Sequence, residues 1–99
     1  MQREKAKVNI QIDNERIRVT EYSFNEGNET GFHTHLWDYV VIPQTNGKLL
    51  LVDDNKVETT ATLVKGKPYY REAGVSHNVI NNGEEKLVFI ELEIKAHTR

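Results

Sequence analysis

The chain has 99 residues and a mass of 11.5 kDa, so we expect one domain over residues 1–99 with a modest hydrophobic core. The formal charge of −2 and the pI near 6.1 argue against nucleic acid and anionic membranes as partners. There is no cysteine, so nitrogen and oxygen atoms must hold any metal. The start of the chain is polar and no long apolar run follows, which predicts a cytoplasmic protein without secretory signal or membrane span.

Short strand-like segments follow one another along the chain, and none has the periodicity of a helix. Gly, Pro, Asn and Asp separate them. The most evident segments are, in chain order, residues 8–12, 17–20, 32–42, 48–52, 57–63, 69–71 and 88–95. In all we expect eight or nine short strands at roughly ten-residue spacing. This pattern predicts an all-β fold, either a small antiparallel sandwich or a barrel.

Two segments predict how two strands connect and which residues of the last strand face solvent. Asn46-Gly47 is typical of a hairpin turn between its flanking strands, because both residues tolerate positive φ. In the last segment the even-numbered positions from 88 to 94 are all apolar. We therefore expect Glu91 and Glu93 on the solvent face of the last strand.

Three of the four histidines form a pattern typical of metal ligands. His33 and His35 are two residues apart in a strand-like segment, so their side chains point to the same face. His77 follows 42 residues after His35 and could arrive from a distant strand. The three imidazoles would then form a facial set of neutral nitrogen donors for a divalent transition metal. His97, in a polar terminal stub, receives no role.

The spacing of these residues resembles that of the cupin superfamily. Gly27, followed after five residues by His33-x-His35, resembles the first cupin motif. The second motif corresponds here to Gly66, Glu72, Gly74, His77 and Asn81. Its one departure is Glu72, where the family has proline. The resemblance covers residues 27–81 and implies a double-stranded β-helix, a jelly-roll barrel with a metal in its mouth, in a protein that forms homodimers.

The first motif departs from the family at its carboxylate ligand. Cupins place that ligand four residues after the second histidine, where this chain has Tyr39, or one residue later in the looser form of the motif, where it has Val40. Residues 33, 35 and 39 share one strand face, so Asp38 points away from the site unless a bulge shifts the register. The site then consists of three histidines, with water or a ligand in the remaining positions. Tyr39 either ligates as a phenolate or hydrogen-bonds to bound water.

Three imidazoles suit one divalent transition metal, and the donor set does not choose among Fe, Zn, Mn, Ni and Cu. Such an ion keeps its +2 charge, attracts anionic oxygen and lowers the pKa of bound water. Candidate residues for a small-molecule ligand are Tyr39, Trp37 and Arg71. Trp37 shares the histidine face by parity, but is otherwise a core or dimer-surface residue. Arg71 is either a fork for a substrate carboxylate or a solvated arginine at the rim.

Three functions are compatible with this pattern. The first is a metal-dependent enzyme, a dioxygenase-like cupin that acts on a small anionic organic molecule. The second is a non-enzymatic module that binds a small ligand or a metal, and the third is a metal-free structural domain. The fold by itself does not separate them. Besides the small molecule, the resemblance implies a second copy of the chain as a partner, and the alternating segment 8–12 could extend the sheet edge of that copy.

Overall fold

The computed structural model describes residues 3–95, which form nine β-strands and no helix. The strands are β1 (Lys7–Asp13), β2 (Ile17–Phe24), β3 (His33–Thr34), β4 (Asp38–Pro43), β5 (Gly47–Asp53), β6 (Glu58–Leu63), β7 (Tyr69–Arg71), β8 (Ser76–Ile80) and β9 (Leu87–Ile94). No helix capable of crossing a membrane occurs in the described range. His97 lies outside it.

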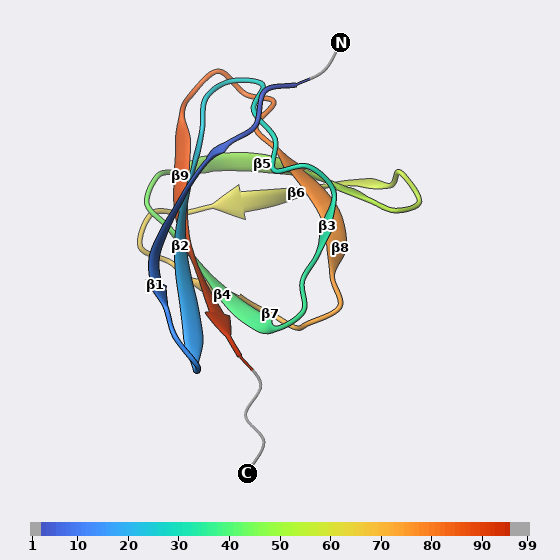
Figure 1. Cartoon of the computed structure of the whole chain (residues 1–99). Coiled ribbons are helices and arrows are strands. Elements are labelled where there is room, and N and C mark those ends of the chain that lie inside the picture. Colours follow the sequence, from blue (N-terminus) through green and yellow to red (C-terminus); the bar gives the residue numbers. More distant parts are fainter. Residues whose placement is uncertain (1–2, 96–99) are drawn as a thin grey trace.

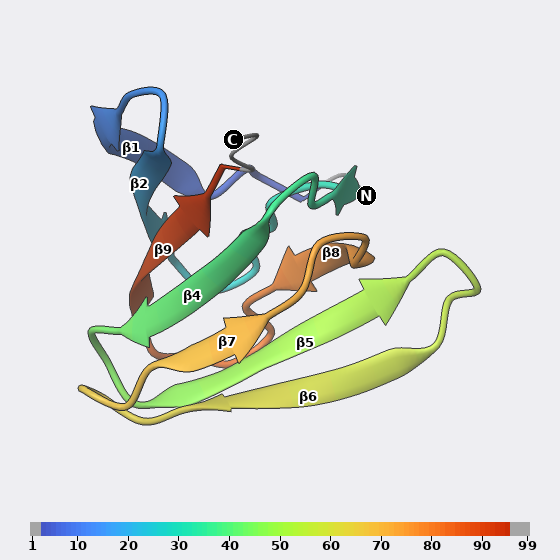
Figure 2. The same ribbon diagram turned by 90° about the horizontal axis from the view of Figure 1, so that it is seen from below.

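The strands form two antiparallel sheets that face each other around a common core (Figure 1). One sheet has the order β1-β2-β9-β4-β7 and the other has the order β3-β8-β5-β6. Consecutive strands thus alternate between the sheets after β2, with β5 and β6 forming a long hairpin (Figure 2). This arrangement is the double-stranded β-helix that the sequence predicted.

The core lies between the two sheets and is built from alternate residues of the facing strands. Tyr22, Phe24 and Phe89 stack with ring centroids between 5.3 and 6.4 Å apart. Leu49 and Leu63 face them from the second sheet and are almost fully buried. Burial of such side chains stabilises the fold by about 25 cal/mol for each Å² of apolar surface removed from water.

The connection through Asn46 and Gly47 is not the hairpin that the sequence predicted. β4 pairs with β7 and β9, whereas β5 pairs with β6 and β8, so this connection carries the chain from one sheet to the other (Figure 2). A Cβ atom at Gly47 would lie 2.4 Å from Cδ2 of Leu87, which is 2% exposed. Gly47 is therefore required for a close approach between the sheets.

The prediction for the two faces of the last strand was also wrong. In β9 the odd-numbered residues point into the barrel, and Phe89 and Glu91 are 4% and 6% exposed. Glu93, on the same face, is half-buried. Apolar residues occur on both faces of β9, so alternation alone did not identify the interior face. Leu87 and Phe89 on the odd-numbered face were the available signal.

Candidate metal centre

The pairing of β3 with β8 brings two histidines from distant parts of the chain together. His33 and His77 are direct partners in this antiparallel register, so their side chains share the face that lines the barrel. His35 follows two residues after His33, and its amide donates to the carbonyl of Val75 at 2.9 Å. This bond extends the pairing beyond the strand and holds His35 on the same face.

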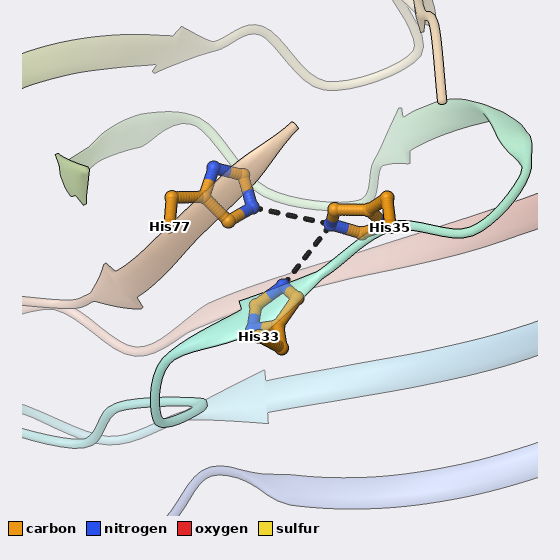
Figure 3. A group of neighbouring side chains, drawn as sticks. All are labelled: His33, His35 and His77. Atoms are coloured by element: carbon orange, nitrogen blue, oxygen red, sulfur yellow. Dashed lines mark hydrogen bonds between the residues drawn. The ribbon is translucent and has the colours of Figure 1, made fainter. Parts of the chain in front are cut away.

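The three imidazole rings converge through their Nε2 atoms (Figure 3). Nε2 of His35 lies 3.0 Å from Nε2 of His33 and 3.1 Å from Nε2 of His77. The ring planes meet at 73–89°. With metal–nitrogen bonds of about 2.1 Å, two donors at a right angle lie about 3.0 Å apart, so both separations fit neighbouring corners of one coordination sphere.

The second nitrogen of a histidine ring determines whether Nε2 has a free lone pair. Nδ1 of His33 lies 2.8 Å from the carbonyl oxygen of Gly31, which can only accept, so Nδ1 carries the proton. Gly31 has a φ of 88°, and its amide donates to Oδ1 of Asn78 at 3.0 Å, which fixes that carbonyl. The lone pair on Nε2 of His33 is therefore available to a metal.

Burial keeps two of the three imidazoles neutral. It lowers the pKa of His35 to about 3, and charge on His33 or His77 adds to the effect. It also lowers the pKa of His77 to about 4, with smaller contributions from His33 and Arg71. Neutral imidazole is the form that binds metals. The chemistry of the donor set therefore fits a divalent transition metal.

Tyr39 lies beside the histidines, and its ring stacks on His35 with centroids 3.9 Å apart and 15° between the planes. Burial, followed by the charge of Glu91, raises the pKa of the Tyr39 phenol above its usual value of 10.0. The hydroxyl is therefore protonated at neutral pH unless a metal ionises it. Asp38 faces the other way, as strand parity predicted, and accepts the amide of Ala73 at 2.8 Å.

A small cavity opens beside His77 inside the barrel. The volume that the centre of a water molecule can occupy is about 20 Å³, so the cavity has room for about one water. The lining residues are Tyr39, Val41, Leu49, Leu51, Tyr69, Arg71, His77, Val79, Phe89 and Glu91. Arg71 is exposed, and its guanidinium carbon lies 5.5 Å from the ring centroid of Tyr69. Among residues 3–95 it forms no salt bridge, so its charge is available to an anion at the cavity.

Trp37 is not among the residues that line this cavity. It is half-buried against two cations: the guanidinium carbon of Arg18 is 5.2 Å and Nζ of Lys95 is 5.4 Å from its ring centroid. Both cations also form salt bridges with Asp13, at 3.3 Å and 2.6 Å. Trp37 thus belongs to a cluster at the start of β2 and the end of β9. Its contacts there anchor the segment between β3 and β4.

The structure adds two carboxyl groups that the sequence reasoning had assigned to solvent. Glu91 lies behind His35, with Oε1 3.8 Å from Nδ1. Burial, together with the charge of Glu93, raises the pKa of Glu91 to about 8. One ligand atom from each of His35, Glu91 and Glu93 lies within 4.8 Å of the other two. The histidine centre therefore has acidic neighbours on β9.

Together these features define a double-stranded β-helix with a candidate metal centre inside its barrel. The chain belongs to the cupin superfamily: it is 50% identical to a cupin domain from Bordetella pertussis, with a TM-score of 0.91 over 97% of this chain and 99% of that chain. No family model matches the chain.

Two further relatives differ in their sequence identity to this chain. The chain is 48% identical over 93 residues to the beta-alanine degradation protein BauB of Pseudomonas aeruginosa, which covers 94% of this chain and 97% of that protein. A Klebsiella pneumoniae protein with a double-stranded β-helix domain is 16% identical, with a TM-score of 0.76 over 96% of this chain and 81% of that chain. The second likeness concerns the fold alone.

Proposed function

We propose that the protein binds one divalent transition metal through Nε2 of His33, His35 and His77. The convergence of the three Nε2 atoms, with separations of 3.0 and 3.1 Å, carries this proposal. When bound, the ion would supply positive charge that attracts and polarises an anionic oxygen ligand. The imidazole set accommodates Fe, Zn, Mn, Ni or Cu.

We further propose that a small organic anion binds beside this metal. Arg71 would hold its carboxylate by charge-assisted hydrogen bonds, because its guanidinium lies at the cavity without an acidic partner in residues 3–95. The protonated hydroxyl of Tyr39 would donate a hydrogen bond. The cavity is small, so only a short part of the molecule would enter the barrel. Trp37 contributes indirectly, by anchoring the chain between His35 and Tyr39.

The function that we favour is an oxygenase-like enzyme in a cytoplasmic homodimer. Similarity to a protein named for beta-alanine degradation supports action on a short metabolite, and beta-alanine itself carries a carboxylate that suits Arg71. The alternative is a binding module without turnover, which the missing motif carboxylate at Tyr39 and the small cavity favour. Oxygen uptake by the iron-loaded protein with short carboxylic acids distinguishes the two functions.

The metal proposal is tested by metal titration and elemental analysis. We expect one ion per wild-type chain, and a loss of affinity of about 100-fold or more in His77→Ala because a ligand is removed. Ser76→Ala is the matched control, since Ser76 is the preceding residue of β8 and its Oγ pairs with Oγ1 of Thr34 at 2.8 Å. Wild-type affinity in His77→Ala would overturn the proposal.

A further inference from the structure

β9 places a carboxyl group next to the position where the cupin motif has its carboxylate ligand. That position is Tyr39 on β4, and Glu93 is its direct partner in the β4–β9 register. Residues opposite each other in an antiparallel pair point to the same face, with Cβ atoms about 4.5–5.5 Å apart. Glu93 therefore lies one strand away from the motif position, on the same face of the sheet. We propose that Glu93 supplies a carboxylate ligand to the metal, an inference that rests on the proposed three-histidine centre.

Glu93 lies close to His35, one of the three histidines of the centre. One ligand atom from each of His35, Glu91 and Glu93 lies within 4.8 Å of the other two, and His35 also belongs to the converging triplet. Two ligands of one metal that lie at a right angle are about 3.0 Å apart. Glu93 is half-buried rather than packed in the core, and the proposal requires its side chain to reach the metal from another rotamer.

The cations near Glu93 are engaged with other residues. Arg18 is its cross-strand partner on β2, but Nε of Arg18 lies 3.3 Å from Oδ2 of Asp13, and the guanidinium lies over Trp37. Nζ of Lys95 lies 2.6 Å from Oδ1 of the same Asp13. Across residues 3–95, no salt bridge to Glu93 is formed. Both cations thus pair with Asp13, and neither forms a salt bridge with the Glu93 carboxylate.

Glu91 has a different role from Glu93. Its Oε1 is closest to Nδ1 of His35, at 3.8 Å, whereas Nε2 of that ring faces the other histidines. An ionised carboxylate on the Nδ1 side orients a ligating imidazole and favours the tautomer with a free Nε2, so Glu91 takes this role when it loses its proton. Glu91 is therefore a positioning residue that acts through His35.

The test uses cobalt(II) as the probe, because its visible absorption reports the ligand set and titration gives its affinity. Glu93→Gln removes the ligating charge with little change of shape. We expect an affinity about 10-fold or more below that of the wild type and a changed absorption spectrum. Glu91→Gln should lower the affinity while the ligand atoms, and hence the form of the spectrum, stay the same. Glu21→Gln on β2 is the control, since it removes the same charge from the opposite face.

The outcomes separate this inference from the proposed function. If the wild type binds cobalt(II), and Glu93→Gln matches Glu21→Gln in both affinity and spectrum, the assignment of Glu93 is overturned and the three-histidine centre stands. If the wild type binds no cobalt(II), both are overturned. Thermal unfolding of the metal-free variants shows whether a lost affinity reflects folding. An unchanged midpoint together with a changed spectrum in Glu93→Gln supports ligation.

Discussion

The phenol ring of Tyr39 lies flat on the imidazole of His35, with ring centroids 3.9 Å apart and 15° between the planes. The two residues are four apart in the chain, on either side of the start of β4 at Asp38. This stack fixes the plane of the imidazole, while Glu91 lies on its Nδ1 side. Tyr39 therefore contacts the site through its ring.

Removal of the Tyr39 hydroxyl tests whether it binds the metal. We expect Tyr39→Phe to keep the wild-type metal affinity within about twofold, because the stack on His35 remains and the raised pKa of Tyr39 keeps the phenol protonated. Tyr39→Leu removes the stack and should weaken binding by about 10-fold, as expected when an orienting neighbour of a ligand is lost. Metal titration measures both. A visible metal–phenolate band in the wild type that Tyr39→Phe lacks would show direct coordination.

Substitutions of Arg71 test the anion site. Arg71→Gln should leave the metal content unchanged and weaken the binding of short carboxylates by about 10- to 100-fold, the loss expected for a charged hydrogen bond. Arg71→Lys keeps the charge without the planar fork, so its carboxylate affinity should lie between those of the wild type and Arg71→Gln. Calorimetric titration of the metal-loaded protein measures the affinities. Equal carboxylate affinity in wild type and Arg71→Gln would exclude Arg71 as the anchor.

The buried histidines predict how the stability of the metal-free protein depends on pH. In the folded protein the pKa values of His35 and His77 are about 3 and 4, below the usual 6.5. Between pH 6.5 and 4 these two rings therefore bind protons in the unfolded chain but not in the folded one. The unfolding free energy contributed by these rings is fully present above pH 6.5 and decreases as pH falls through that range. Urea titrations measure it, and His77→Gln should show a weaker acid dependence.

Glu91 contributes to the pH dependence of stability with the opposite sign. Its folded pKa of about 8 lies above the usual 4.5, so the folded chain binds the extra proton and this contribution to stability is lost as pH rises through 8. Glu91→Gln should therefore stabilise the metal-free protein most at alkaline pH. Identical pH profiles for Glu91→Gln and the wild type would contradict the burial of an ionisable group at this position.

Gly47 tests the close approach between the sheets. Gly47→Ala should destabilise the protein by about 1–3 kcal/mol, because the new methyl group overlaps buried Leu87. Gly83→Ala is the control, since the nearest atom to its Cβ would be 3.6 Å away. Urea unfolding of both variants provides the comparison. Equal stability would mean that Leu87 relaxes without cost.

The edge strand β1 tests the expected homodimer. β1 lies at the end of the five-stranded sheet, and Val8, Ile10 and Ile12 are 54%, 55% and 46% exposed. Association with a second copy through this edge should be blocked by Ile10→Lys, because charge on an edge strand opposes strand pairing. Analytical ultracentrifugation should show a wild-type dimer and a monomeric variant. A monomeric wild type would remove the prediction.

Much of the architecture could be predicted because it depends on local chemistry. Alternating apolar residues and turn residues identified most strands, and the motif residues Gly27, Gly66 and Gly74 lie at turns with positive φ values of 84°, 79° and 100°. Asn81 is a buried turn residue, whose amide nitrogen donates to the carbonyls of Phe24 and Glu85. The connection at Gly47 could not be predicted, because the same dipeptide serves a hairpin or a crossing between sheets.

The sequence by itself determined that His33 and His35 share a face, because the two-residue period of a strand is a property of the backbone. Only the tertiary structure decided that His77 lies directly opposite His33, since strand register depends on the packing of the whole sheet. It also decided that the face of β9 with Glu91 and Glu93 is the interior one. Both faces of that strand carry apolar residues, and the enclosing sheets, not the alternation, select the one that meets the histidines.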